Sequence, residues 1–394
     1  MSDDLINTVD RLAAEHCGPA LREAAEQGRW PADLWQALEE TGLTKAALPE
    51  HAGGAGLDFA EAMLVLQRSA WHALPVPLME TMLAGRMLSA AGLAVPDGAL
   101  TIAPVLATEQ LALSKSPKGW AVTGQARRVP WGAQCAHGLI VATFDGQEMA
   151  GLLACDALNP GVLNRQTPFD TNCVPCPEFV EGSGRTVLPE QCRNLAGEAR
   201  AGLRFEAQPL LTCAPLQDAR ARLQHEGALM RSVQMRGALE HALELSLRYA
   251  KERVQFGRPI GAFQAVQHML ALLAGQVAAS GAACDAAVQA AGEQADAFWS
   301  AVAKARVGEA AGKGAEIAHQ VHGAMGFTRD HGLHQLTRRL WSWRDEFGSE
   351  AYWQERLGCE AAARGADALW PMLTVIPGLT GNPFATVDSR SSRE

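Results

Sequence analysis

The chain has 394 residues, which at about 100–200 residues per domain is enough for two or three domains. Hydrophobic residues make up 48% of the chain and charged residues 20%, a balance that excludes a wholly disordered or fibrous protein. The formal net charge of −9 disfavours a nucleic-acid binder held by phosphate contacts.

The amino terminus, MSDDLINTVD, lacks the positive start and apolar stretch of a secretory signal, so we expect a cytoplasmic protein. No stretch reaches the roughly eighteen uninterrupted apolar residues of a membrane span. The apolar segment over residues 73–95 is broken by Glu80 and Arg86. The sequence therefore predicts no membrane span.

The first 99 residues favour a helical domain, because apolar side chains recur at helical spacing in Leu34 and Leu38 and again in Phe59 and Met63. Residues 100–215 hold short apolar runs such as GWAVTG and GLIVATF between glycine, proline and polar turns. That pattern predicts a β domain, for which we expect an antiparallel sheet.

Residues 216–374 predict a bundle of long helices, with further irregular sequence over 375–394 that indicates a disordered tail. We expect helices over about 218–251, 265–291 and 295–324, and a final pair within 333–369. The segment 271–291 is rich in alanine, glycine and serine, which is typical of a bundle interior or of a subunit interface.

Two segments have the composition of a binding site. The first, YAKERVQFGRPIGAFQAVQH, places Arg253 and Phe256 near a turn and Gln264 and Gln267 on one face of the next helix. Such residues hold a phosphate, an aromatic ring and amide hydrogen bonds together. The alternative is a helix–loop–helix with the phenylalanine in the core and the arginine in a surface ion pair.

The second segment, QVHGAMGF, closes a predicted helix with Gly323 and Gly326. A glycine turn exposes the backbone and lets a ligand approach closely, although an ordinary helix cap has the same composition. Cys173 and Cys176 form a single C-x-x-C without a second one. The histidine pairs His319–His322 and His331–His334 also lack an acidic or cysteine ligand to complete a set. We therefore expect no metal site.

Taken together, the helical start, β middle and helical end with these two segments resemble the acyl-CoA dehydrogenase family over about residues 5–369. The resemblance implies an α+β multidomain fold with an N-terminal helical domain, a middle antiparallel β domain and a C-terminal four-helix bundle. It also implies a dimer or a dimer of dimers with FAD extended between subunits.

By resemblance, Arg253 meets the FAD pyrophosphate, Phe256 the adenine side and Gln264 the polar middle of the cofactor. The turn with Gln320, Gly323 and Ala324 contacts the adenosine end of an FAD bound mainly to the neighbouring subunit.

The family reaction removes the α-proton of an acyl thioester with a carboxylate base, while the β-hydrogen leaves as hydride to the flavin. Here the usual base position holds Phe347, followed by Gly348. A shift of one residue makes Glu346 the base. Some members place the base on the first bundle helix instead, near Gly227, where Glu226 lies beside it. The alternative for either glutamate is a solvated helical carboxylate.

The β domain also departs from the family pattern. It retains Thr108 and Glu109 but lacks the glycine–serine–aspartate loop that holds the flavin ring. Trp131 is a candidate replacement for the ring-binding tryptophan, and buried packing is its alternative role.

These observations lead to one principal hypothesis and two alternatives. The first is an FAD-dependent acyl-CoA dehydrogenase of fatty acid or steroid side-chain metabolism that passes electrons to an electron-transfer flavoprotein. The second is a catalytically impaired partner subunit of a hetero-oligomeric acyl-CoA dehydrogenase. The third is a flavin monooxygenase or oxidase on the same scaffold.

Overall fold

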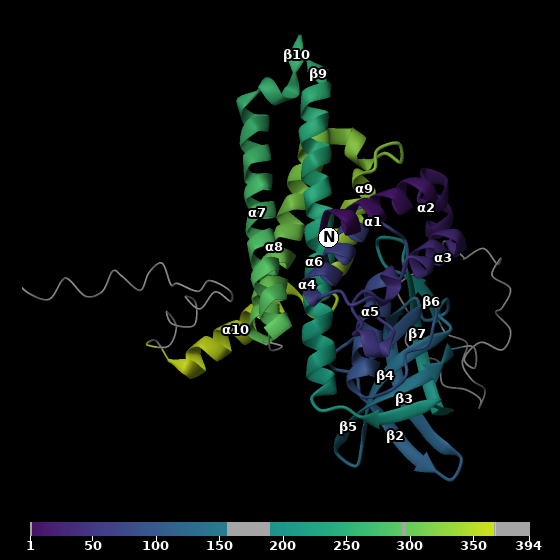
Figure 1. Cartoon of the computed structure of the whole chain (residues 1–394). Coiled ribbons are helices and arrows are strands. Elements are labelled where there is room, and N and C mark those ends of the chain that lie inside the picture. Colours follow the sequence, from purple (N-terminus) through teal and green to yellow (C-terminus); the bar gives the residue numbers. More distant parts are fainter. Residues whose placement is uncertain (1, 156–189, 294–296, 366, 368–394) are drawn as a thin grey trace, which may run out of the picture.

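A computed structural model describes residues 2–155, 190–293, 297–365 and 367. Helices form both ends of the chain and a sheet forms the middle, which confirms the predicted fold class (Figure 1). The domain boundaries at residues 99, 215 and 374 stay predictions, and Cys173, Cys176 and the tail over 375–394 lie outside the described residues.

The first part of the chain is a set of short helices. They are α1 (Ser2–His16), α2 (Pro19–Glu26), α3 (Ala32–Glu40), α4 (Phe59–Trp71) and α5 (Leu78–Ala90), with 3-10 turns η1 (Leu43–Lys45) and η2 (Glu50–Ala52). Helix α4 begins where the Asp58 side chain accepts from the Glu61 N–H and the Glu61 side chain accepts from the Asp58 N–H. This capping box satisfies two free donors of the first turn.

The sheet has the strand order β6-β7-β3-β2-β4-β5-β8, with β1 paired to β4. The strands are β1 (Leu100–Ala103), β2 (Leu111–Ser116), β3 (Gly119–Pro130), β4 (His137–Phe144), β5 (Gln147–Ala154), β6 (Glu190–Arg193), β7 (Ala199–Pro209) and β8 (Thr212–Pro215). Both β1 and β2 run parallel to β4, so the sheet is mixed and the expectation of a purely antiparallel sheet was wrong. The β2–β3 hairpin lies between β1 and β4 in the sequence. After this hairpin the chain enters β4, which runs beside β1 in the same direction.

The last part is the helical bundle, formed by α6 (Ala219–Glu252), α7 (Gln264–Glu293), α8 (Ala297–His322), α9 (Leu333–Trp343) and α10 (Glu350–Arg364). Helix α6 starts beside the sheet and ends at the small hairpin of β9 (Val254–Gln255) and β10 (Arg258–Pro259), at the far end of the molecule (Figure 1). The turns η4 (Ile260–Ala262) and η5 (Gly323–Phe327) lead into α7 and follow α8. These bounds agree with the helices expected from the sequence.

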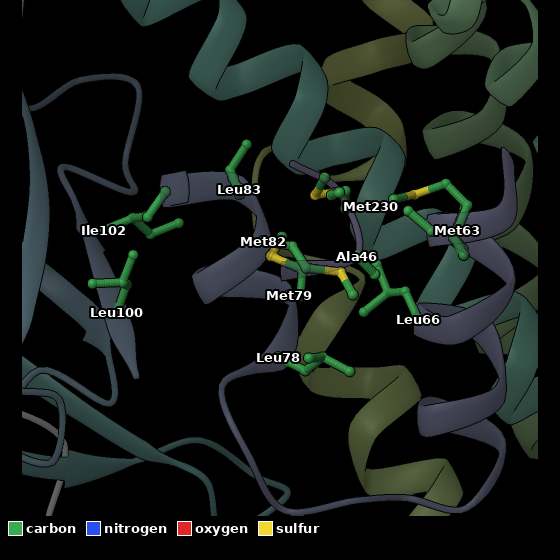
Figure 2. Close-up of a cluster of buried hydrophobic side chains, with 14 of the residues drawn as sticks. Ala46, Met63, Leu66, Leu78, Met79, Met82, Leu83, Leu100, Ile102 and Met230 are labelled. Carbon is green, nitrogen blue, oxygen red and sulfur yellow. The ribbon is translucent and has the colours of Figure 1, made fainter. Parts of the chain in front are cut away.

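A methionine-rich core joins the three parts. Figure 2 shows Met63 of α4, Met79 and Met82 of α5 and Met230 of α6 facing one another, with Leu100 and Ile102 of β1 beside them. The flexible methionine side chain fills irregular gaps where helices and a sheet meet. Helix α4 approaches α6 so closely that a Cβ at Gly237 would lie 2.1 Å from the Gln67 carbonyl oxygen, which explains glycine at that position.

Helix α7 packs on α8 and α6 but leaves much of its apolar surface exposed. Residues 264–291 are long and apolar enough to cross a membrane by length and composition, and 28% of the most apolar window is buried. The helix contains no long uninterrupted apolar run, because glutamine, histidine and serine are interspersed among its alanines and leucines.

Candidate functional site

The first bundle helix ends in a tight hairpin with Phe256 and Gly257 at its tip. Their φ angles are +51° and +77°, the left-handed values that a two-residue hairpin turn requires at both central positions. Glycine adopts this conformation freely, whereas Phe256 does so at a cost of about 1–2 kcal/mol. The Phe256 ring is 93% exposed, so the core alternative for this residue was wrong.

The structure brings the two predicted binding segments to the same end of the bundle. The ring of Tyr249, near the end of α6, stacks on His322 at the end of α8, with centroids 4.7 Å apart. The predicted cofactor residues are all exposed there: Arg253, Phe256, Gln264, Gln320, Gly323 and Ala324.

The chemistry of these residues fits the phosphate and ring portions of a dinucleotide. Among the described residues, Arg253 has no carboxylate within ion-pair distance, so its guanidinium is available to phosphate oxygens. Gly323 has a φ of +57° and open space where a Cβ would point. Met325 and Phe327 add exposed apolar surface beside this turn. Gln267 instead donates to the Gly261 carbonyl oxygen and supports the preceding turn.

The two predicted base positions lie in contact and both are apolar. A Cβ built on Gly227 of α6 would lie 2.5 Å from two ring carbons of Phe347, so the ring rests directly on the glycine. Phe347 is 2% exposed and has a left-handed φ of +55°. Neither residue accepts a proton. Neither of the two positions expected for the base therefore carries a carboxylate.

Glu346, the residue before Phe347, lies between two buried arginines. One carboxylate oxygen accepts from the Arg200 guanidinium, and the other accepts from Arg231 Nε at 2.8 Å. Burial raises the pKa of Glu346, but Arg200 and Arg231 lower it by more, so the pKa lies below its usual value. A carboxylate with both oxygens bound and a lowered pKa is a poor general base. It is not the solvated helical carboxylate that was its alternative.

The Glu346 pairs belong to a larger buried ion network. Arg231 also donates to Glu80 of α5, and Arg200 donates to Glu198. Glu198 further accepts from Arg339 and from the Trp343 indole, and despite burial its arginine partners lower its pKa to about 2. Three carboxylates and three guanidinium groups from α5, β7, α6, α9 and their turns thus neutralise one another.

Sequence reasoning missed this network. The available signal was a set of charged side chains inside apolar stretches: Glu80 in LMETMLAG, Arg231 in ALMRSVQM and Arg200 in an alternating strand. Charged residues in such positions are buried in pairs because an unpaired buried charge is costly.

Glu226 is also paired. It is 8% exposed and accepts from Arg86 Nε at 3.0 Å and from Arg222 at 3.2 Å. Arg86 and Arg222 thus occupy the carboxylate oxygens that Glu226 would need to accept a substrate proton. Because Glu226 is buried, it is not the solvated helical carboxylate of the alternative prediction either.

A buried lysine holds the turn that carries Phe347. Lys304 of α8 is 0% exposed, and its Nζ donates to the carbonyl oxygens of Arg344 and Gly348 at 2.6 and 2.7 Å. Burial lowers the pKa of Lys304 to about 7, against the upward effect of nearby Glu346, Asp345 and Glu350. A neutral lysine amine has two N–H donors, and the carbonyl oxygens of Arg344 and Gly348 accept one each.

Trp131 packs where the N-terminal helices meet the sheet. It is 5% exposed, and its ring lies edge-on to Trp30 with centroids 6.4 Å apart. Glu109 accepts from the Arg127 backbone N–H, and Thr108 lies in the loop before β2. The surroundings of Trp131 favour the packing role over contact with a flavin ring.

The chain matches two family models, the acyl-CoA dehydrogenase N-terminal domain over residues 2–94 and the acyl-CoA dehydrogenase C-terminal domain over residues 217–355. The chain belongs to the acyl-CoA dehydrogenase family. It is accordingly an oxidoreductase of the class that acts on the CH–CH group of an acyl-CoA.

Similar proteins include the acyl-CoA dehydrogenase IpdE2 of Mycobacterium tuberculosis, which is 29% identical over 85% of this chain and 89% of that protein. Among solved structures, a Tcur3481-Tcur3483 steroid ACAD variant has a TM-score of 0.76 at 25% identity, covering 92% of this chain and 98% of the other. The ChsE4-ChsE5 complex from Mycobacterium tuberculosis has a TM-score of 0.78 at 23% identity, covering 93% and 98%. The second likeness concerns the fold alone.

The contact between Gly227 and Phe347 predicts a specific steric effect. We expect Gly227→Ala to lower stability by about 1–3 kcal/mol through overpacking, although alanine is the better helix former. Combination with Phe347→Ala should remove most of this loss. Denaturant unfolding of both single variants and the double variant measures the coupling.

Gly358→Ala in α10 is the matched control, because a Cβ there meets nothing within 4 Å. It should raise stability by about 1 kcal/mol. A Gly227→Ala protein as stable as the control would contradict the close contact.

The buried amine of Lys304 predicts a pH effect. The pKa of Lys304 is about 7 in the folded chain and near the ordinary lysine value of 10.5 when unfolded, so the unfolded chain binds more protons between these values. Stability should therefore rise with pH in this window. Relative to Lys304→Met, the wild type should gain up to about 1.4 kcal/mol per pH unit from pH 7 to 9.

Denaturant unfolding at several pH values gives this difference. Lys313→Met, on the exposed side of the same helix, is the control. A difference between wild type and Lys304→Met that stays constant with pH would contradict a neutral buried amine.

Proposed function

We propose that this chain is one subunit of an FAD-dependent acyl-CoA dehydrogenase, and that a partner chain supplies the carboxylate base. The assembly would introduce an α,β-double bond into an acyl-CoA thioester and pass the electrons to an electron-transfer flavoprotein. The observation that carries this proposal is a contrast: the cofactor residues are exposed together, whereas both base positions are apolar and in contact.

When bound, FAD would supply the hydride acceptor. In this chain, Arg253 would pair with the pyrophosphate, Phe256 would cover the adenine side and Gln264 would hydrogen-bond the polar middle. The open backbone around Gly323 would let Gln320 and Ala324 approach the adenosine end. The exposure of all these residues supports a cofactor shared with another subunit.

The exposed apolar face of α7 supports the same arrangement. The helix begins at Gln264, after the hairpin and the η4 turn, and runs along the bundle. Its small residues allow close helix packing. We infer that a second subunit covers this face, rather than a membrane, and we keep the cytoplasm as the expected location.

The solved relatives support two different chains in the assembly. Two similar structures have paired names, Tcur3481-Tcur3483 and ChsE4-ChsE5, and the first is a steroid ACAD. We therefore propose a hetero-oligomer and include steroid acyl thioesters among the substrates to be tested. No feature of the described residues favours the monooxygenase or oxidase alternative.

The cofactor assignment predicts a selective loss of flavin. Arg253→Ala should weaken FAD retention at least tenfold, since a charge-assisted hydrogen bond contributes about 1.5–3 kcal/mol. Flavin absorbance per chain after gel filtration measures retention, and unfolding temperature checks the fold. Lys251→Ala, an exposed cation two residues earlier, is the control. Equal retention by both variants would refute the assignment.

The subunit assignment predicts dependence on a partner. The chain alone should not reduce a flavin acceptor with any acyl-CoA, whereas the chain co-expressed with a related protein that carries the base should. Full activity of the isolated chain would overturn the partner-subunit proposal. Rapid reoxidation of reduced flavin by oxygen would favour the oxidase alternative instead.

A further inference from the structure

The turn predicted to contact the cofactor rests on a buried histidine. His319 of α8 is 7% exposed, and its ring stacks on Phe327 at the end of η5, with centroids 4.1 Å apart and an angle of 20° between the rings. A Cβ built on Gly326 would lie 3.0 Å from His319 Nδ1, so the backbone of the turn packs against this nitrogen. The position of η5, which includes Gly323 and Ala324, therefore depends on the His319 ring.

The hydrogen bonds of His319 decide which ring nitrogen carries the proton. The Thr337 hydroxyl donates to the Leu333 carbonyl oxygen, so the Thr337 oxygen accepts from His319 Nε2–H at 2.8 Å. The other nitrogen, Nδ1, is buried and has no hydrogen-bond partner among the described residues. A proton added to Nδ1 would be a charged donor without an acceptor, and burying such a group is costly.

The groups around His319 become cationic in acid. His334, in the first turn of α9, lies close enough to lower the pKa of His319 by charge repulsion. The ring of His322, one turn further along α8, stacks on Tyr249 of α6. The same ring meets His331 edge-on, with centroids 4.5 Å apart. A second proton in this cluster is therefore opposed by the first.

The fixed charges around the cluster do not compensate. Arg248 of α6 is close enough to lower the pKa of His331 as well. Glu316 and Asp330, the nearest acidic residues in the sequence, are exposed. Neither they nor any other carboxylate in the described part of the chain shifts the pKa of these histidines. An imidazolium formed here would have no counter-ion.

His319 is the histidine of this cluster on which acid should act most directly. His322 also lies beneath the turn, but the carbonyl oxygens of Ala318 and Leu245 favour its charged form. His319 has no such acceptor for a second proton.

We propose that His319 is a positioning residue for the cofactor. In its neutral form it holds the Gly323–Phe327 turn in the shape that meets the adenosine end of FAD, and its protonation frees the turn and weakens FAD binding. The inference rests on the proposed function, because it takes this turn as part of the cofactor site. Acid thus acts on FAD binding through the backbone of the turn.

The direction of the pH effect follows from burial. Burial and the charge of His334 lower the pKa of His319 below the ordinary histidine value of 6.5. Once the turn opens, the ring regains its ordinary pKa, so the open form binds more protons than the closed form when the pH falls below this value. The closed form is fully favoured above it and loses at most about a factor of ten for each pH unit below it.

The test measures the dissociation constant of FAD at pH 7.5 and at pH 5.5. It uses the full-length chain together with any chain that co-purifies with it, and titration of flavin fluorescence gives the constant. We expect the wild-type constant to be about tenfold larger at pH 5.5. A change of less than about twofold would overturn the proposal.

Two variants replace His319 with a side chain that does not titrate. The ring of His319→Phe can still stack on Phe327, and the amide of His319→Gln can still donate to Thr337. In either variant, the ratio of the two dissociation constants should be about fivefold smaller than in the wild type. His51→Phe is the control, because His51 is exposed on η2, and it should keep the wild-type ratio. Wild-type ratios in the His319 variants would contradict the assignment.

Hydrogen exchange of the FAD-free protein tests the turn itself. In peptides that cover residues 320–330, the exchange rate of the wild type relative to His319→Phe should rise about fivefold from pH 7.5 to pH 5.5. Comparing the two proteins at the same pH removes the intrinsic effect of pH on exchange. A relative rate that does not change with pH would show that His319 does not control the turn.

The FAD titration separates this inference from the proposed function. A protein that binds FAD equally well at both pH values refutes only the role of His319. A protein that binds no FAD at either pH refutes the proposed function, and the inference falls with it.

Discussion

The pairing of Glu346 with Arg200 and Arg231 is the interaction on which the interior of this molecule depends. It joins the α9–α10 turn to the sheet and to the first bundle helix, and through Glu80 it reaches α5. Hydrophobic packing brings these elements together without fixing their angles, whereas charged hydrogen bonds have a narrow geometry. Removing one partner of such a buried pair commonly costs 3–5 kcal/mol, because the remaining charge has no water to turn to.

The two ends of the bundle consequently differ in what they offer a ligand. At the hairpin end, the side chains of Arg253 and Phe256 are exposed to solvent and do not belong to the core. At the other end, Phe347 and its neighbours are committed to the core by hydrogen bonds and ion pairs. The first region keeps polar and aromatic groups free for a ligand, whereas the second supports the fold, and this contrast is the basis of the proposed partner-subunit role.

Much of the fold followed from sequence patterns. Helical spacing predicted the long helices well because α6, α7 and α8 each extend over many turns, and short apolar runs predicted the β domain. The mixed order of the sheet did not follow, since the position of β1 beside β4 depends on how the chain crosses the sheet and not on local composition.

The candidate site was predicted unevenly for a similar reason. The predicted cofactor segments are each contiguous in sequence, so their residues could be recognised by spacing, and the structure places Arg253 and Gly323 at one end of the bundle. The ion network combines residues as distant as Glu80 and Glu346, whose partners are decided by tertiary packing. Sequence could indicate that one expected base position holds Phe347, but not that its ring rests on Gly227 at the other expected position.

The contact between Phe347 and Gly227 also constrains how this protein can change over evolutionary time. A carboxylate introduced at residue 227 would collide with the ring, because even a Cβ there lies 2.5 Å from it. The ring must shrink first, and only then does residue 227 accept a side chain. The order of the two substitutions is thus fixed by sterics, so a larger side chain at residue 227 is not a single mutational step away.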